Sequence, residues 1–369
     1  MGALSSLTSL DDALGHLLEG LQAVPVREQP IDQALGRISA GLTAPGPLPV
    51  KAVAMIDGWA VRSLDIVGAS SYSPVALIAP PAWVECGQSL PDGCDSVIEP
   101  QSLDQQGGLF QIVAEVRPGQ GVRRAGDEIA AGSPVIKSGQ TIRPLDLLIA
   151  TGLGLHSLPV RLPRLRLINI ASEDGQSSTA QYIAHLTDRA GAAVTRVDAA
   201  RTASAIASVL NVEDADLIVT VGGTGAGKTD ATVDALQSAG ILVAHGIAMM
   251  PGRTAAIGRN GNVPIIALPA MLEDTLAAWW TLVLPVLDQL TARQRPTVMR
   301  PIARKIASAP GIADVVLLMY EADVWLPLSV GELSLRALAR ADAWMLVPGN
   351  SEGFPVGALC HAYPLGEDI

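Results

Sequence analysis

The stretch that decides the fold is Ala215–Gly240, which reads ADLIVTVGGTGAGKTDATVDALQSAG. An apolar run typical of a strand ends at Val221, and a glycine-rich loop leads into a helical segment. Within it, Gly222–Thr229 read GGTGAGKT, which satisfies the phosphate-binding pattern G-x-x-x-x-G-K-[ST]. In a strand-to-helix context this pattern is typical of an ATP or GTP site, with Lys228 and Thr229 at the start of the helix. A P-loop nucleotide hydrolase is therefore one interpretation.

That interpretation lacks a partner carboxylate. Phosphoryl transfer also needs an acid at the end of a neighbouring strand to hold the metal ion. The runs ILVAHG and PIIALP end without one, and VVLLMYEAD lies in a later β-rich module.

A second interpretation makes the glycines the functional part and the Lys228-Thr229 pair incidental. The pattern G-G-T-G-A-G-x-x-D, which ends at Asp230, then describes a nest of backbone N–H groups followed by a carboxylate. Such a loop can hold a phosphate through its amides and a metal ion through the acid. A third interpretation is a glycine-rich turn that serves only the fold.

The composition favours a globular protein of several domains and argues against some classes of function. The chain has 369 residues, of which 49% are hydrophobic and 17% charged. Its net charge of −11 argues against a nucleic-acid binder. The three scattered cysteines and five dispersed histidines suggest no disulfide scaffold and no metal site, which fits a reducing cytoplasm. The longest apolar run, LAAWWTLVLPVL, is too short to cross a membrane, and no secretory signal is evident, so we expect a cytoplasmic protein without a membrane partner.

Hydrophobic periodicity predicts an α/β plus β fold in several domains. After Arg164, strand-like runs alternate with helical segments near 177–190, 201–210 and 229–239, which predicts a doubly wound parallel sheet. A long apolar helix over about 271–290 would complete it. Short apolar runs between Pro- and Gly-rich turns predict further β domains. We expect the following division: an N-terminal helical and linker domain, 1–57 and 140–163; a small β lid domain, 58–139; an α/β domain, 164–295; and a C-terminal β-rich domain, 296–369.

Beyond these patterns, the chain resembles the molybdopterin molybdenumtransferases, the MoeA and gephyrin E-domain family. GGTGAGKTD, with ADLIVT before it and PGR after it, resembles the molybdopterin-binding motif of that family. AMIDGWAVRSLD resembles the family's S-A-M-D-G-Y-A-V-R and places Asp57 on its acid. VRRAGDEI resembles R-x-x-G-E-D-I and places Arg123 on its arginine. GQSLPDGCDSVIEPQ and GFPVGALCHAYPL match in the same order, so the resemblance runs from about residue 8 to 365.

The resemblance implies an elongated multidomain subunit that forms a homodimer, with a molybdopterin-binding α/β domain. The implied activity is insertion of molybdate into adenylylated molybdopterin with Mg²⁺, releasing AMP and the molybdenum cofactor, with molybdoenzyme maturation partners as further contacts. The implied catalytic acids are Asp57, Glu173, Asp198 and Asp230, of which Asp57, Glu173 and Asp230 would also hold the metal ion. The implied residues for molybdopterin or adenylyl-molybdopterin binding are Gly222, Gly223, Thr224, Gly225, Gly227, Lys228, Arg123 and Arg253.

Departures from the family pattern gather at this expected site. The family's S-T-G-D-E becomes NIASE, which keeps Glu173, and L-P-G-N-P-V-S becomes LPAMLED. K-x-x-x-K-P-G-K becomes GIAMMPGR, so Gly246 and Met250 replace two basic residues and Arg253 remains. Two interpretations therefore stay open: an active transferase, in which Lys228 compensates for the lost charge, or a catalytically impaired member that carries or senses molybdopterin.

Overall fold

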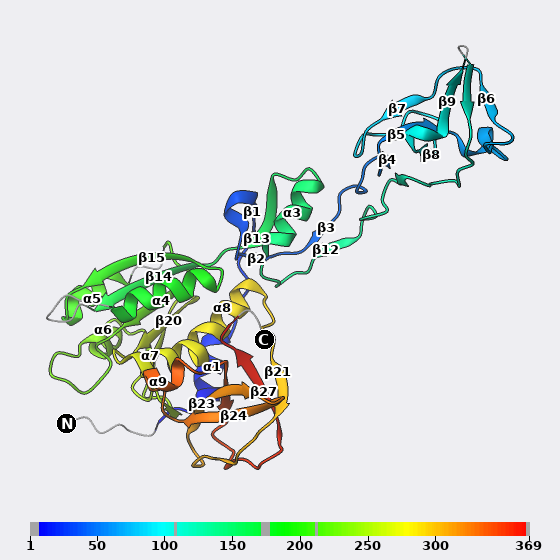
Figure 1. Ribbon diagram of the computed structural model, residues 1–369. Coiled ribbons are helices and arrows are strands. Elements are labelled where there is room, and N and C mark those ends of the chain that lie inside the picture. The colour runs from blue at the N-terminus through cyan, green and yellow to red at the C-terminus, as the bar shows by residue number, and fades with distance from the viewer. Residues whose placement is uncertain (1–6, 107–108, 171–177, 211–212, 367–369) are drawn as a thin grey trace. The chain divides into compact units, whose positions relative to one another are not determined.

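The chain forms two compact units (Figure 1). The computed structural model describes residues 7–106, 109–170, 178–210 and 213–366. The larger unit comprises residues 1–40, 138–143 and 159–369, and the smaller unit comprises residues 41–137 and 144–158. The division into four domains remains a prediction.

A six-stranded sheet forms the centre of the larger unit. Its strand order is β15-β14-β16-β20-β19-β17. The strands span Ala193–Ala199 (β15), Arg164–Ile170 (β14), Leu217–Val221 (β16), Val263–Leu268 (β20), Ala256–Asn260 (β19) and Leu242–His245 (β17). The first four are parallel neighbours, whereas β19 is antiparallel to both β20 and β17.

The expected doubly wound sheet is confirmed, but the prediction that it is wholly parallel is wrong. Only Gly261 and Asn262 separate β19 from β20, and Gly261 has a φ of 58°. A two-residue connection can join only antiparallel strands, and a left-handed glycine suits such a tight turn. The β19–β20 hairpin therefore places one reversed strand between β20 and β17.

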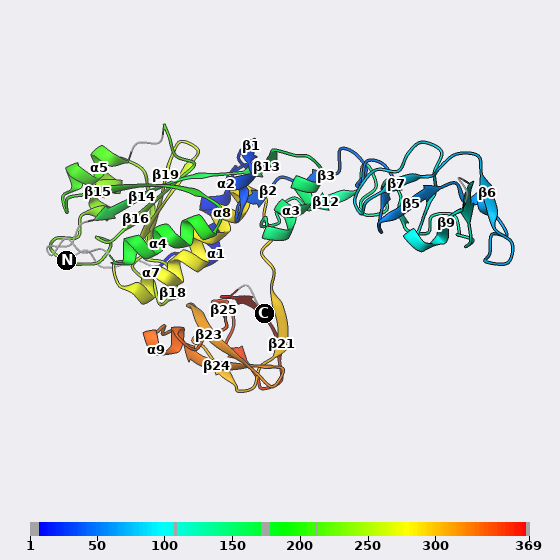
Figure 2. The ribbon, with the colours of Figure 1, turned by 45° about the horizontal axis from the view of Figure 1, so that its top comes forward.

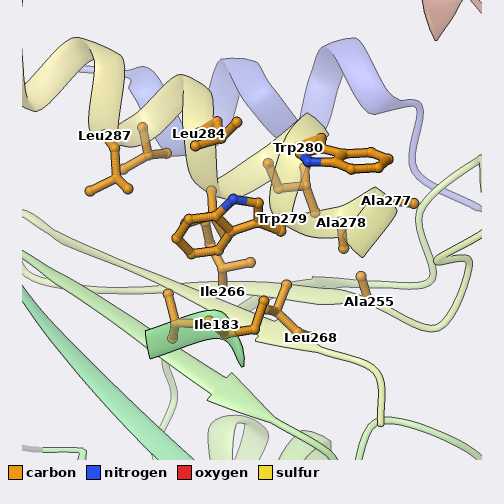
Figure 3. Packing of buried hydrophobic residues seen from close by; sticks show 14 of the residues in the cluster. Ile183, Ala255, Ile266, Leu268, Ala277, Ala278, Trp279, Trp280, Leu284 and Leu287 are labelled. Atoms are coloured by element: carbon orange, nitrogen blue, oxygen red, sulfur yellow. The ribbon is translucent and has the colours of Figure 1, made fainter. Parts of the chain in front are cut away.

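Helices cover both faces of the sheet, as expected from the alternation of strands and helices. On one face, α5 (Ala203–Val209) and α6 (Thr232–Ser238) pack on one hydrophobic cluster. The other face carries α4 (Ser178–Arg189), α1 (Leu10–Leu18) and the segment that follows β20. Figure 3 shows Trp279 of that segment packed with Ile266 and Leu268 of β20 and Ile183 of α4.

The apolar segment after β20 is not the single helix that the sequence predicts. It consists of α7 (Leu272–Ala278), the π-helix η3 (Trp279–Val283) and α8 (Leu284–Thr291). Leu284 donates its N–H to the carbonyl of Trp279, five residues earlier, and Pro285 has no N–H to donate. The loss of the usual helical hydrogen bond at proline explains the widened turn at this point.

The C-terminal part of the larger unit is β-rich, as expected, and Figure 2 shows its strands β21, β23, β24 and β25. Some of its buried residues, among them Val315 and Trp344, belong to the same hydrophobic cluster as residues of the α/β part. Its principal sheet has the order β18-β23-β25-β27-β21, with β24 paired to β23. The elements are β18 (Met249–Met250), β21 (Val298–Pro301), β22 (Ile306–Ala307), β23 (Ala313–Glu321), β24 (Val324–Val330), α9 (Leu335–Leu338), β25 (Ala343–Val347), β26 (Gly353–Phe354) and β27 (Leu359–Pro364). Trp344 stacks between Trp280, at 5.4 Å, and Tyr363, at 4.6 Å between ring centroids. Aromatic stacking thus joins β25 to the π-helix.

Short strands dominate the smaller unit. They form the sheets β7-β5-β8 and β6-β10-β9 and the pairs β11-β4 and β12-β3. Their bounds are β3 (Leu42–Thr43), β4 (Val53–Ala54), β5 (Gly58–Val61), β6 (Val75–Leu77), β7 (Ala82–Val84), β8 (Ser96–Ile98), β9 (Leu103–Gln106), β10 (Leu109–Ile112), β11 (Val122–Arg123) and β12 (Pro134–Ile136). The helices of this unit are η1 (Ser63–Ile66), η2 (Pro100–Ser102) and α3 (Pro144–Gly152). The expected small β domain is therefore seen in this part of the chain.

A further small sheet has the order β1-β13-β2. Its elements are β1 (Val26–Pro30), α2 (Ile31–Ala34), β2 (Ile38–Ser39) and β13 (Ser157–Arg161). Across the described residues, no helix has the length and apolar character needed to span a lipid bilayer.

Candidate functional site

The candidate site lies at the carboxyl edge of the six-stranded sheet. Asn169 of β14 is paired in register with Asp198 of β15 and with Val221 of β16, so the ends of these strands meet there. The chain leaves β14 toward α4 on one face and leaves β16 toward α6 on the opposite face. Ligands of open α/β sheets bind in the crevice that such divergent connections create.

The glycine loop, Gly222–Asp230, follows β16 at this edge. Gly222 and Gly223 have φ angles of 100° and 70°, in the left-handed region that favours glycine. Gly222 donates its N–H to the carbonyl of Leu268 at 2.9 Å and accepts the hydroxyl of Thr232 at 2.8 Å. A Cβ at position 223 would lie 2.5 Å from that hydroxyl oxygen. The first two glycines are therefore required by the path of the chain.

The loop presents hydrogen-bond donors that the protein does not use. The N–H groups of Gly223, Thr224, Gly225 and Ala226 donate to no acceptor in the described parts of the chain. Thr224 is 1% exposed, and its hydroxyl has no partner among the same residues. Because a buried polar group without a partner is costly, these donors fit an anion that enters the loop.

Asp230 closes the loop from within. Its Oδ2 accepts the N–H of Gly227 at 3.1 Å, and its Oδ1 accepts from Nη2 of Arg201 at 3.3 Å. A Cβ at position 225 would lie 2.6 Å from Oδ2, and one at 227 would lie 3.1 Å from it. Gly225 and Gly227 thus leave room for this carboxylate.

Lys228 and Thr229 lie in a turn, and α6 begins only at Thr232. The prediction that this pair starts the helix is wrong, because Asp230 donates its N–H to Gly227 and turns the chain first. Lys228 is exposed and has no ion pair among the described residues. The loop consequently differs from the strand-to-helix geometry that the nucleotide-hydrolase interpretation requires.

Asp198 lies at the same edge as the loop but is engaged with another residue. Its Oδ1 accepts Nδ2 of the buried Asn169 at 2.8 Å. Glu173, a predicted catalytic and metal-binding acid, lies outside the described residues.

The segment that contains the predicted Arg253 reaches the glycine loop through a histidine. His245, the last residue of β17, approaches the carbonyl of Thr224 at 3.0 Å through Nε2. A carbonyl only accepts, so this nitrogen carries the proton in that contact. Ile247 then donates to the carbonyl of Arg253 at 3.0 Å. Arg253 is exposed at the same edge, where it can meet an anion.

The two segments that depart most from the family pattern are bound to each other. Gly252, in GIAMMPGR, donates its N–H to Oδ1 of Asp274, in LPAMLED, at 2.6 Å. Gly252 has a φ of 103°, and a Cβ there would lie 2.8 Å from Cε of Met249. Asp274 therefore fixes the backbone directly before Arg253.

The remaining predicted residues lie in the smaller unit. Asp57 is exposed, and its Oδ1 accepts the N–H of Cys86 at 2.7 Å. Arg123 is paired in β11 with Val53 of β4 and forms an ion pair with Glu128. Asp57 and Arg123 are thus each held near the β4–β11 pair, within one unit.

The metal site expected from Asp57, Glu173 and Asp230 stays a prediction, because Glu173 lies outside the described residues. The described residues contain no group of three His, Cys, Asp or Glu side chains placed to hold a metal ion. Asp57 belongs to the smaller unit, and Asp230 belongs to the larger one, where each of its two carboxylate oxygens accepts one hydrogen bond.

Three residues of the site were not predicted: Arg201, His245 and Asp274. Arg201 follows β15, His245 is the last residue of β17, and Asp274 lies in the first turn of α7. Each reaches the glycine loop or the PGR segment through one contact. The signal available in the sequence was positional, since each residue lies where an element ends or begins at the carboxyl edge.

Two hollows occur elsewhere in the described structure. One of about 260 Å³ lies at the start of α1, beside Pro348, Gly349 and Asn350. The other, of about 590 Å³, lies in the smaller unit beside Arg62, Asp65 and Cys94. No residue of the glycine loop lines either hollow.

These features define a class of protein: a doubly wound α/β domain with an anion-receptive glycine loop at its switch point, accompanied by small β modules. Residues 8–154 match the MoeA N-terminal region (domain I and II), and residues 162–289 match a probable molybdopterin binding domain. The chain belongs to the molybdopterin molybdenumtransferase (MoeA) family, a family of transferase enzymes.

Individual relatives agree with this assignment. The chain is 30% identical to molybdopterin molybdenumtransferase 2 of Mycobacterium tuberculosis over 70% of its own length and 73% of that protein. It is 26% identical to a putative molybdopterin biosynthesis protein of Methanocaldococcus jannaschii over 92% of both chains. The fold matches a crystal structure of a molybdopterin biosynthesis MoeA protein from Pyrococcus with a TM-score of 0.76, at 22% identity, over 97% of this chain and 99% of that one.

Proposed function

We propose that this protein inserts molybdate into adenylylated molybdopterin, with Mg²⁺, and releases AMP and the molybdenum cofactor. The observation that carries the proposal is the set of unused donors on the glycine loop, at the switch point of a family domain named for molybdopterin binding. In this proposal the free N–H groups and the Thr224 hydroxyl receive the phosphate of the pterin.

Positive side chains attract the remaining anionic groups. Lys228 and Arg253 are exposed at the carboxyl edge. Arg123, which forms an ion pair with Glu128, is assigned to ligand binding only on the strength of the family resemblance. The chain carries a net charge of −11, so a local group of cations is needed to draw in molybdate and a nucleotide phosphate. Mg²⁺, the homodimer, the cytoplasmic location and the molybdoenzyme partners belong to this proposal on the strength of the family resemblance.

A second candidate function is molybdopterin binding without catalysis, as a carrier or sensor. The pairing of Asp230 with Arg201 favours it, because that carboxylate is not free to act as a base or ligand. Two of the family's basic positions, now Gly246 and Met250, also lack a cation.

Reconstitution separates the two candidates. The purified protein is supplied with adenylylated molybdopterin, molybdate and Mg²⁺, and AMP release and cofactor formation are followed. Stoichiometric AMP and active cofactor support the transferase. Pterin bound tightly with no AMP above a protein-free control supports the carrier, and ATP hydrolysis that depends on Lys228 would instead favour a nucleotide hydrolase.

A further inference from the structure

Arg201 and Asp230 join two loops at the carboxyl edge of the sheet. Arg201 lies between β15 and α5, where Thr202 caps the helix, and Asp230 ends the glycine loop before α6. Their side chains are 31% and 16% exposed, and Nη2 lies 3.3 Å from Oδ1. This contact puts a permanent positive charge against the acid of the binding motif, since an arginine stays protonated in proteins.

The donor set around Asp230 does not suit a divalent ion. Mg²⁺ requires oxygen ligands in near-octahedral geometry at about 2.0–2.1 Å. Oδ1 of Asp230 accepts from Arg201, and Oδ2 accepts from Gly227. No other acidic side chain within the described ranges joins it in a metal-binding group. A metal ion at Asp230 would therefore have to displace the guanidinium and overcome its repulsion.

We infer that Arg201 takes the place of a metal ion at Asp230, and that Asp230 is a positioning residue for Arg201 rather than a metal ligand. The arginine neutralises the carboxylate, so the free N–H groups of the loop can receive an anion without a bound metal ion to screen Asp230. Thr224, whose buried hydroxyl has no partner among the described residues, adjoins Gly225, which packs against the same carboxylate. Only the identity of the anion rests on the proposed function.

The pair could instead serve only to tie the starts of α5 and α6, which pack on the same hydrophobic cluster. That role predicts equal losses of stability in variants of either residue and no change in metal uptake. Mn²⁺ uptake can be followed by electron paramagnetic resonance with the metal alone. If the pair had only this structural role, substitution of either residue would leave Mn²⁺ uptake unchanged.

The test compares wild type with Arg201→Gln, Arg201→Lys and Asp230→Asn. Arg164→Gln is the matched control, because Arg164 pairs with Asp216 at 3.0 Å at the opposite edge of the same sheet. We expect Asp230→Asn to leave the Mn²⁺ uptake of the wild type unchanged. Removal of the competing guanidinium in Arg201→Gln should raise the Mn²⁺ affinity of the protein about tenfold, and Asp230→Asn in that background should abolish the gain. The charge retained in Arg201→Lys should keep the ion out, and Arg164→Gln should have no effect.

Anion binding gives a second arm with inorganic pyrophosphate as the probe and no metal present. Arg201→Gln should weaken its binding about tenfold, and the control should not. The inference is overturned if the wild type takes up Mn²⁺ and the Asp230→Asn variant does not. It is also overturned if Arg201→Gln changes neither Mn²⁺ binding nor pyrophosphate binding. Should Arg201→Gln fail to fold, the wild-type, Arg201→Lys and Asp230→Asn comparison still decides the metal question. Failure of the transferase assay, by contrast, would leave these metal and anion results intact.

Discussion

Asp274 accepts the backbone N–H of Gly252 at 2.6 Å, and this single hydrogen bond joins the two segments in which the chain departs most from its family. Gly252 is buried, so loss of the acceptor would leave its N–H without a partner. We predict that Asp274→Ala lowers the free energy of unfolding by about 1–3 kcal/mol and weakens pterin binding through movement of Arg253. Asp274→Asn keeps an acceptor oxygen and should cost less. Chemical denaturation measures the loss of stability, and pterin titration measures the loss of affinity, with Glu273→Gln as the control. Equal effects in Asp274→Ala, Asp274→Asn and Glu273→Gln would contradict the role assigned to Asp274.

Lys228 should act on binding rather than on stability. It is exposed, and no described residue forms an ion pair with it. We predict that Lys228→Ala weakens binding of molybdopterin or adenylyl-molybdopterin about tenfold, because a charge-assisted contact is lost, while the midpoint of unfolding stays the same. Unchanged affinity would remove Lys228 from the site. Lys305→Ala, which removes one positive charge from the C-terminal module, is the control for net charge.

Gly225→Ala should damage the loop more than Gly227→Ala. The added methyl would lie 2.6 Å from Oδ2 of Asp230 at position 225 and 3.1 Å from it at position 227. The first change must displace the carboxylate and should reduce pterin affinity by about tenfold or more. Gly15→Ala in α1 meets nothing within 4 Å and should instead raise stability by about 0.5–1 kcal/mol. Pterin titration and thermal unfolding of the three variants test these predictions. Equal pterin affinities of Gly225→Ala and Gly227→Ala would refute the expected difference between the two positions.

Trp344 should link the stability of the C-terminal β module to that of the α/β part. It stacks between Trp280 and Tyr363, and it is 5% exposed. We predict that Trp344→Ala costs about 3–5 kcal/mol, whereas Trp344→Phe keeps one ring in the stack and costs less. Denaturant unfolding measures both. If the alanine variant unfolded at the wild-type midpoint, the stack would have no part in stability.

Asp95 should make the smaller unit sensitive to acid. Burial alone would raise its pKa, but hydrogen bonds from the N–H and hydroxyl of Ser63 and the hydroxyl of Ser96 lower it below 3.8. The folded state thus favours the ionised carboxylate, and its contribution to stability is present above the unfolded pKa and lost as the pH falls through the folded pKa.

We predict that hydrogen exchange at the Ser63 amide accelerates as the pH falls below about 4, beyond the intrinsic change in exchange rate. In Asp95→Ala this amide should exchange fast at every pH, because its acceptor is missing, at a cost of about 1–3 kcal/mol to local stability. Asp92→Ala, a neighbouring exposed acid, serves as the control. Protection at Ser63 that is independent of pH in the wild type would contradict the assignment.

Local sequence patterns predicted the strand and the glycine loop of the site. They did not predict the contacts that residues from distant segments make with that loop. β16, the glycines after it and Asp230 follow one another within one short stretch of sequence. The arrangement of this loop therefore depends mainly on neighbouring residues. Arg201, His245 and Asp274 reach the site only because β15, β17 and β20 end at the same edge, which depends on strand order. The hairpin between β19 and β20 reverses the direction of β19 in a sheet that was expected to be parallel. Pro285 accompanies a π-helix within the segment that was expected to be a single helix. Both effects arise from backbone geometry that hydrophobic periodicity does not record.

The larger unit is interrupted twice by segments of the smaller one, at residues 41–137 and 144–158. Its first helix, α1, is buried against α8, and Thr8 exchanges hydrogen bonds with Gly246 and Ala248. During synthesis, the opening residues must therefore remain unpaired until most of the chain has been made, whereas the smaller unit has all its residues by position 158. Since domains generally fold as units during synthesis, we expect the smaller unit to fold before the larger one is complete. The α/β part needs both α1 and α8, so it can be completed only after residue 291 has been made.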